Sequence, residues 1–187
     1  MRTIYVTEFI SLDGVIEAPG GEEGYRHTGW SFDIEDDPTR FEYKAEETFG
    51  TETLLLGRTT YEGFAEAWPS RDGEFADKFN GMDKVVVSST LTDPTWQNTT
   101  VVRDLDAVRA LKEGDGGPIG VHGSATLAQS LHKAGLVDEW HLMVFPVVLG
   151  SGKRLFPTDA EDKVKLTLRE SRTYTNGVQL NLFDTVR

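Results

Sequence analysis

The chain has 187 residues, with 19 Lys and Arg against 31 Asp and Glu, and a formal net charge of -12 at pH 7. This acidic balance disfavours nucleic-acid partners, because a broad acidic surface repels the phosphate backbone. Cysteine is absent, which excludes disulfides, thiolate nucleophiles and cysteine-ligated metals. The four histidines are scattered, so we expect no metal site. The length predicts one domain over residues 1–187.

The N-terminal residues lead directly into a strand-like stretch, and no apolar run is long enough for a signal peptide or a membrane span. We therefore expect a cytoplasmic protein with no membrane partner.

Strand and helix patterns alternate along the chain. In chain order, the predicted elements are a strand over 4–9, a Gly-rich loop over 14–36, a helix from Asp37-Pro38 to Gly50, a strand over 53–56, a helix over 57–68, strands over 84–89 and 100–103, a helix over 105–113, a strand over 119–122, a helix over 125–134 and a long strand over 138–149.

The C-terminal part has a β pattern. Apolar residues alternate from Val164 to Leu168 and again from Val178 to Leu182, and Asn176-Gly177 between them is the strongest signal for a two-residue hairpin turn. Parallel crossovers early in the chain and a hairpin at its end predict an α/β fold. Its sheet is mixed and mostly parallel, with helices on both faces.

Two predicted strand-to-helix junctions look alike: Gly57-Arg58-Thr59-Thr60 and Gly123-Ser124-Ala125-Thr126. Glycine lets a ligand approach the backbone, and the unpaired N–H groups of a helix start can hold a phosphate. Two such helix starts would suit a pyrophosphate. Each junction alone is equally typical of an ordinary turn and helix cap.

Four elements in a fixed order carry a family resemblance that covers essentially the whole chain. They are Ser11-Leu12-Asp13-Gly14, Gly57 to Glu62 followed by Val85 to Ser89, Gly123 to Leu127, and Pro146 to Phe156 after Asp138-Glu139. In these elements the chain resembles the dihydrofolate reductase superfamily. It looks most like the stand-alone reductase domain, the C-terminal domain, of riboflavin-biosynthesis deaminase/reductase proteins.

The resemblance implies a dihydrofolate-reductase-like three-layer sandwich of about eight strands that binds NADPH at the carboxyl edge of its sheet. It also implies a homodimer, with a surface on the strand near Trp140 to Leu149 and on the C-terminal hairpin. Carried over by position, the cofactor residues are Gly57, Arg58, Thr59, Thr60, Ser88, Ser89, Gly123, Ser124, Ala125, Thr126 and Leu127. Arg58 would lie near the adenosine 2′-phosphate, because a guanidinium forks onto a phosphate; alternatively, Arg58 only pairs with a neighbouring carboxylate.

One residue departs from the family pattern. Where the family usually has two consecutive glycines, this chain has His122-Gly123, so a retained cis peptide would cost about 3 kcal/mol. His122 is either a donor near the phosphates or a packed side chain.

The substrate side of the site is harder to assign. Asp33, Glu35, Asp36, Asp37 and Glu42 are candidates for a substrate acid, and Asp13 is either another candidate or a turn residue. Lys153-Arg154 either serves a phosphorylated substrate or is solvated, and Arg103 matches the cofactor pattern poorly.

The first hypothesis is an NADPH-dependent oxidoreductase that transfers a hydride to a pteridine-like heterocycle or a ribosylamino-pyrimidine, with residues 14–36 and Trp30 as a lid. The zinc deaminase motifs of the bifunctional proteins are absent from the sequence. The alternative is a non-catalytic nucleotide or small-molecule binding protein on the same fold.

Overall fold

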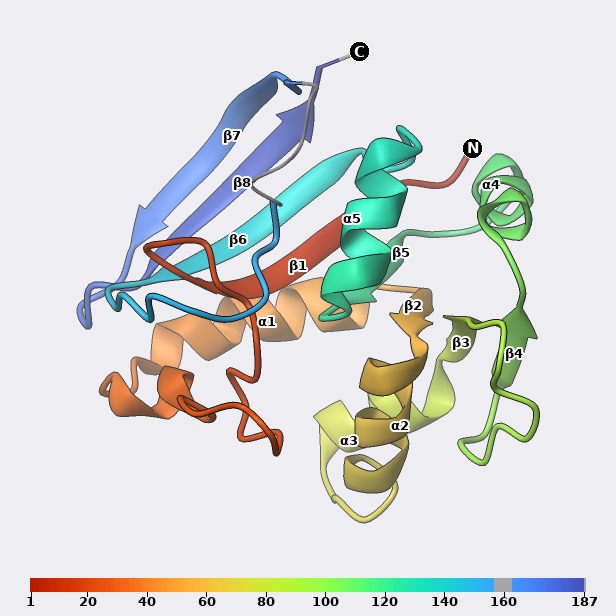
Figure 1. Cartoon of the computed structure of the whole chain (residues 1–187), viewed down its shortest axis with the longest axis horizontal. Helices are drawn as coiled ribbons and strands as arrows, with labels where there is room; N and C mark the ends of the chain where they lie inside the picture. The colour runs from red at the N-terminus through yellow and green to blue at the C-terminus, as the bar shows by residue number, and fades with distance from the viewer. Residues whose placement is uncertain (157–162, 187) are drawn as a thin grey trace.

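The computed structural model describes residues 1–156 and 163–186, and it contains one sheet with helices on two sides (Figure 1). The strands are β1 (Ile4–Ser11), β2 (Thr53–Gly57), β3 (Asp83–Val87), β4 (Thr99–Val102), β5 (Ile119–His122), β6 (Glu139–Phe145), β7 (Leu166–Thr173) and β8 (Gln179–Thr185). The helices are α1 (Pro38–Gly50), α2 (Arg58–Ala67), α3 (Glu74–Gly81), α4 (Leu105–Glu113) and α5 (Ala125–Lys133), with a short 3₁₀ helix at Trp30–Asp33.

The strand order is β4-β3-β2-β5-β1-β6-β8-β7. All neighbouring pairs from β4 to β6 are parallel, and β8 runs antiparallel to both β6 and β7. The predicted α/β class, the mostly parallel sheet and the C-terminal antiparallel hairpin are therefore confirmed.

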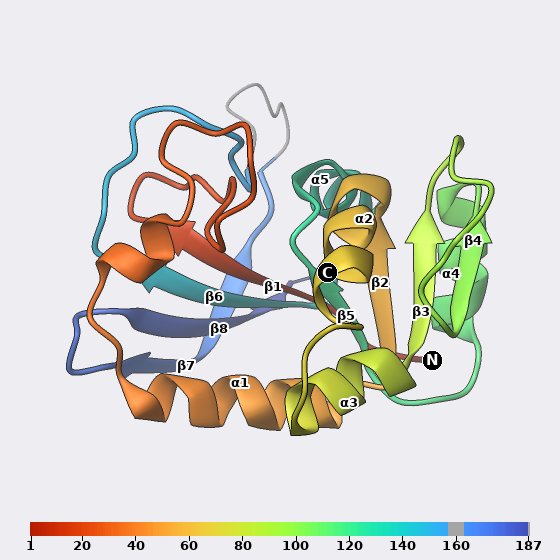
Figure 2. The same cartoon turned by 90° about the horizontal axis from the view of Figure 1, so that it is seen from below.

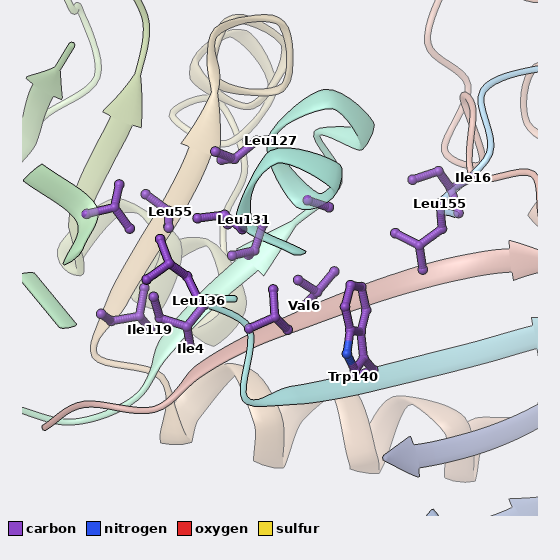
Figure 3. Packing of buried hydrophobic residues seen from close by; sticks show 14 of the residues in the cluster. Ile4, Val6, Ile16, Leu55, Ile119, Leu127, Leu131, Leu136, Trp140 and Leu155 are labelled. Carbon is purple, nitrogen blue, oxygen red and sulfur yellow. The ribbon is translucent and has the colours of Figure 1, made fainter. Parts of the chain in front are cut away.

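The helices cover the two faces according to the alternation of side chains along the strands. Leu55 of β2 packs in the core with Leu127 and Leu131 of α5, on the face shown in Figure 3. The flanking residues Leu54 and Leu56 belong to a second cluster with side chains of α2 and α3. Because successive strand side chains point to opposite faces, the apolar run of β2 fills both layers.

The central strands separate at their carboxyl ends. Pairing between β1 and β5 stops at Thr7 and His122, yet β1 continues to Ser11, paired on its other side with β6. The arrows of β1 and β2 diverge strongly in Figure 2. The edge of β1 from Glu8 onward is therefore not covered by β5, and ligands of open α/β sheets bind at such positions.

Several local predictions need correction. The strand predicted to reach Leu149 ends at Phe145, since Pro146 has no N–H for the ladder. The hairpin loop has three residues, because Tyr174 N–H donates to Val178 O and Gly177 adopts φ +84°, as in a turn closed by a left-handed glycine. The helix α3 was not predicted at all.

Asp37 anchors the start of α1, as the sequence predicts. Its carboxylate accepts hydrogen bonds from Thr39 N–H at 3.0 Å and from Thr175 N–H and hydroxyl at 2.9 and 2.6 Å. The hydroxyl groups of Thr175 and Thr39 hold the pKa of Asp37 well below its usual range. One carboxylate thus joins α1 to the β7–β8 hairpin.

Replacing Asp37 with Ala should lower the thermal unfolding midpoint by about 2–4 °C, the effect of a lost helix cap in a domain of this size. Differential scanning calorimetry at pH 7 measures the shift. Asp33→Ala, which removes an exposed carboxylate, is the control. Equal midpoints for the two variants would contradict the anchoring role.

Candidate functional site

The two glycine-containing junctions meet at the carboxyl edge of the sheet. Gly57 N–H, at the end of β2, donates a hydrogen bond to Ser124 Oγ at 2.9 Å. The Ser124 hydroxyl donates in turn to Thr60 Oγ1 at 2.8 Å. The starts of α2 and α5, the two predicted junctions, are thus joined directly through one hydroxyl group.

Both junctions are tightly packed around their glycines. A Cβ on Gly57 would lie 3.2 Å from Ser124 Oγ, and a Cβ on Gly123 would lie 3.2 Å from Thr60 Cγ2. Gly123 and Ser124 have φ of +59° and +65°, a region that glycine adopts readily and serine rarely. The close approach of the two helix starts therefore depends on these glycines.

The helix starts also differ in their caps. Asp37 and Asp104 cap α1 and α4 through their side chains, whereas no side chain caps α2 or α5. Helix α3 also lacks a side-chain cap, but it begins in a loop after α2 and not at a strand end. The first N–H groups of α2 and α5 are therefore available to an anion, and the helix dipoles favour one there.

The other residues carried over from the family lie around this point with different degrees of exposure. The Arg58 side chain is half exposed, and its Nε lies 3.7 Å from Glu62 Oε1. Thr59 and Thr126 are exposed, while Leu127 is buried in the core. Arg58 and the two threonines can reach a ligand, whereas the Leu127 side chain has a packing role.

Ser88 and Ser89, which the resemblance places on the adenosine side of the cofactor, lie in a loop that is held together by its own hydrogen bonds. Ser88 Oγ accepts N–H groups of Thr90 and Leu91 at 3.2 and 3.0 Å. Arg103 Nη1 donates to Ser88 O and Leu91 O at 2.8 and 2.9 Å. The Ser88 hydroxyl and Arg103 therefore shape the loop after β3, and of the two predicted serines it is Ser89 that is exposed.

The peptide before Gly123 is trans, since the described residues contain no cis peptide. His122 packs edge-on against Phe79, with ring centroids 5.6 Å apart. Burial lowers the pKa of His122 to about 3, so its imidazole is neutral at physiological pH. The packed alternative for His122 thus fits the structure, and the cost of a cis peptide does not arise.

None of the predicted acids is a buried carboxylate that faces the site without partners. Asp33, Glu35, Asp36 and Glu42 are exposed, and Asp37 is the helix cap. Burial opposes ionisation of Asp13, yet hydrogen bonds from the Ser11 hydroxyl and from backbone N–H groups lower the pKa of Asp13 to about 2. Asp13 is therefore a structural turn residue.

The basic pair after β6 is also engaged. Arg154 Nη1 donates to the Asp13 carbonyl oxygen, and Lys153 Nζ lies 3.5 Å from Glu17 Oε1. These contacts tie residues 13–17 to the loop that follows β6. Neither cation is aimed at the paired helix starts.

Glu8, Arg40 and Glu47 are among the buried charged side chains that sequence reasoning missed. The burial of Glu8 could have been predicted from the sequence, because Glu8 lies between Val6 and Ile10 in the alternating pattern of β1 and so shares their face of the strand. Its Oε1 is buried without a hydrogen-bond partner, and burial raises the pKa of Glu8 well above its ordinary value. Arg40 and Glu47 lie on α1, where no such alternation marks them.

Glu47 lies in a saturated polar network between α1 and the sheet. It accepts from Lys44 Nζ and lies 2.7 Å from His141 Nδ1, while His141 Nε2 lies 3.0 Å from Glu139 Oε2. Burial opposes ionisation, but Lys44 and His141 hold the pKa of Glu47 well below its usual value. Because its polar atoms are paired, this network is structural.

The opposite edge of the sheet carries an open hollow of about 570 Å³, lined in part by Lys84, Asn98 and Leu111. Lys84 Nζ is already bonded to the carbonyl oxygens of Asn80 and Met82 at 3.0 and 2.7 Å. Arg2, the other cation of the lining, donates to Gly117 O and Thr53 Oγ1, so both cations of this hollow are already committed. Among the described residues, no group of three or more His, Asp or Glu is arranged to hold a metal ion.

The sequence matches the family model "RibD C-terminal domain" over residues 2–180. Uncharacterized protein YyaP of Bacillus subtilis (strain 168) is 30% identical over 183 residues, covering 95% of this chain and 92% of that protein. Uncharacterized protein YwjB of the same organism is 31% identical over 134 residues, covering 70% of this chain and 72% of that protein.

Two solved structures share the fold. A candidate riboflavin biosynthesis protein from Shewanella sp. PV-4 superposes with a TM-score of 0.76 at 18% identity, covering 99% of both chains. A pyrimidine reductase-like protein from Corynebacterium diphtheriae superposes with a TM-score of 0.67 at 14% identity, covering 99% of this chain and 92% of that one. The expected dihydrofolate-reductase-like fold is confirmed. In the described part of the chain, no helix has the length and apolar character needed to cross a membrane.

Glu8 generates a pH-dependent prediction. Its folded-state pKa is raised, so the unfolded chain loses this proton first, and stability should fall as pH rises from about 4.3 toward the folded pKa. The isostere Glu8→Gln should therefore match wild type near pH 4 and become the more stable protein by pH 8. Urea unfolding at both pH values measures this difference. Glu66→Gln, at an exposed position, is the control. If the stability difference between Glu8→Gln and wild type is the same at both pH values, the buried, protonated state of Glu8 is contradicted.

Proposed function

Because this chain belongs to the RibD C-terminal domain family, we propose that it is an NADPH-dependent oxidoreductase. Its substrate would be a pteridine-like heterocycle or a ribosylamino-pyrimidine. The paired starts of α2 and α5, which lack side-chain caps and are joined through Ser124, are the observation that supports this proposal most strongly. Two adjacent sets of N–H groups suit two adjacent phosphates.

The backbone is well suited to hold this anion on an acidic protein. The chain carries a net charge of -12, which repels a dinucleotide at long range but is screened beyond about 8 Å at physiological ionic strength. The backbone N–H groups at the starts of α2 and α5 would contact the phosphates directly, well within that distance. Gly57 and Gly123 keep side chains away from the contact surface, and the Thr59 and Thr60 hydroxyls can supplement the backbone donors.

Arg58 is the proposed partner of the 2′-phosphate. Its present contact, the Glu62 carboxylate one helical turn away at 3.7 Å, joins two half-exposed side chains. Such a pair contributes little to stability, so Arg58 can leave it for a phosphate, onto which a guanidinium forks. Ser89, exposed at the end of β3, lies on the proposed adenosine side.

Bound NADPH would supply the hydride, and the chain's residues would orient the two reactants and exclude water. The unpaired edge of β1 beyond Thr7 is the proposed place for the reacting rings. Residues 14–36 form the proposed lid. Its base is fixed, since Trp30 is buried and donates from Nε1 to Glu17 O at 2.8 Å, while residues 20–24 are exposed.

The homodimer expected from the resemblance stays a prediction. Trp140 and Phe145 of β6 are buried within the chain itself. The exposed apolar residues of the proposed dimer surface are Val148, beyond the end of β6, and Leu168 of the edge strand β7. The cytoplasmic location also stays a prediction.

Titration of the purified protein with NADPH, followed by fluorescence or calorimetry, tests the proposed function. We expect a dissociation constant below millimolar, and oxidation of NADPH with at least one dihydropteridine or ribosylamino-pyrimidine. Absence of NADPH and NADH binding at millimolar concentration would overturn the proposal. Tight binding without oxidation across the panel would favour the non-catalytic alternative.

Arg58→Ala should weaken the binding of NADPH by about tenfold or more and the binding of NADH by less than twofold, because only NADPH carries the 2′-phosphate. A charge-assisted hydrogen bond to this phosphate contributes about 1.5–3 kcal/mol. Parallel titrations of both cofactors measure the ratio. Arg71→Ala removes another Arg, one that packs on Trp68, and should change neither affinity. An equal loss for both cofactors would remove the assignment of Arg58.

A further inference from the structure

Arg40, in the first turn of α1, is a buried cation with unused hydrogen-bonding groups. The residue is 6% exposed. Its Nη2 donates to Asp36 Oδ1 at 2.9 Å, but Nε and Nη1 are buried and have no hydrogen-bond partner. A buried charge with unmade hydrogen bonds is costly, so this arrangement requires an explanation beyond packing.

The guanidinium lies among aromatic rings. Its Cζ is 5.0 Å from the ring centroid of Phe41, 5.4 Å from that of Phe145 and 5.9 Å from that of Phe9. These rings attract the positive charge through their faces, and they hold the side chain in place. They offer no lone pairs to the Nε and Nη1 hydrogens, so an acceptor must come from elsewhere.

A second unpaired donor belongs to the same aromatic cluster. Tyr174 is buried with Phe145, and its hydroxyl has no hydrogen-bond partner. Burial raises the pKa of Tyr174, so the hydroxyl keeps its proton. The carboxylates of this region are already committed, since Asp36 pairs with Nη2 and Asp37 binds Thr39 and Thr175. The unmet need of the cluster is for an acceptor.

The cluster lies beside the part of the sheet where the reacting rings are proposed to bind. Phe9 follows Thr7, the last residue of β1 that pairs with β5, and Phe145 ends β6. Phe9 and Phe145 pack against each other, with centroids 5.1 Å apart. Phe9, on the stretch of β1 that β5 does not pair, therefore links the surroundings of Arg40 to the proposed place of the reacting rings.

We propose that Arg40 recognises an anionic group on the substrate, a carboxylate or a phosphate attached to a planar ring. This inference deepens the proposed function and rests on it for the reaction. It also narrows the substrate to members of the proposed classes that carry such an anionic group, because a guanidinium has donors and no acceptor. The partly exposed Phe9 and the exposed Phe41 would pack against the planar part while the guanidinium binds the anion.

Three probes of similar shape test the proposal without cofactor: phenyl phosphate, benzoate and the neutral benzamide. Trp30 reports on the site through its fluorescence, because its ring packs edge-on against Phe145 at 5.3 Å. We expect at least one anion to bind tenfold or more tightly than benzamide and to raise the thermal midpoint, since a ligand stabilises the state that it binds. Preference between the two anions identifies phosphate or carboxylate as the substrate group.

Arg40→Met keeps the length and apolar character of the side chain and removes the charge. We expect it to lose the tenfold preference for anions, and to unfold at the same or a higher temperature without ligand, because a partly unpaired buried cation is gone. Arg172→Met is the matched control, since Arg172 also lies over an aromatic ring, that of Tyr43, but its Nε is bonded to Glu170. The control should keep the preference.

Arg40→Lys covers the case in which Arg40→Met fails to fold, and it should bind anions more weakly than wild type but more tightly than benzamide. Equal affinity of wild type for all three probes, or an intact preference in Arg40→Met, would overturn the proposal. The NADPH titration is independent of these measurements. A preference for anions without NADPH binding would overturn the reductase proposal and support the Arg40 site. NADPH binding without a preference for anions would overturn the Arg40 site and support the reductase proposal.

Discussion

The hydrogen bonds of the Ser124 hydroxyl hold the candidate site together. Through this one oxygen the end of β2, the first turn of α2 and the start of α5 are joined, although Ser124 lies more than sixty residues after Gly57 and Thr60 in the sequence. Gly57 and Gly123 ease this close approach, because a Cβ at either position would be tightly packed. The proposed binding of phosphate would thus depend mainly on the placement of the backbone, which the sheet provides.

Buried polar groups divide into two kinds in this structure. The Glu47, His141 and Glu139 network is paired and fixes α1 on the sheet. By contrast, Glu8 and Arg40 each leave atoms without a partner, and both lie near the end of the β1–β5 pairing or in the adjoining first turn of α1. Unpaired buried groups destabilise a fold, and they concentrate at functional sites because the ligand completes their bonds.

The sequence predicts the parts of the molecule that local chemistry determines. The Asp37 cap, the glycine junctions and the alternating strands follow from neighbouring residues, and the resemblance led to the correct family and fold. The end of β6 was overestimated where Pro146 breaks the ladder, and the three-residue hairpin loop was read as a two-residue turn. Arg40 could not be found, because Phe9 and Phe145, which surround it, come from distant strands.

The contrast between local and distant residues explains why the proposed cofactor side of the site could be predicted from the sequence, whereas the proposed substrate side could not. A dinucleotide held by backbone N–H groups leaves a short glycine and threonine signature in the sequence, whatever the substrate is. In our proposal the substrate instead meets side chains from α1 and from the ends of β1 and β6, which the order of the strands does not determine. A single residue in the first turn of α1, acidic or basic, would therefore set the charge of the substrate while the fold and the proposed cofactor site stay the same.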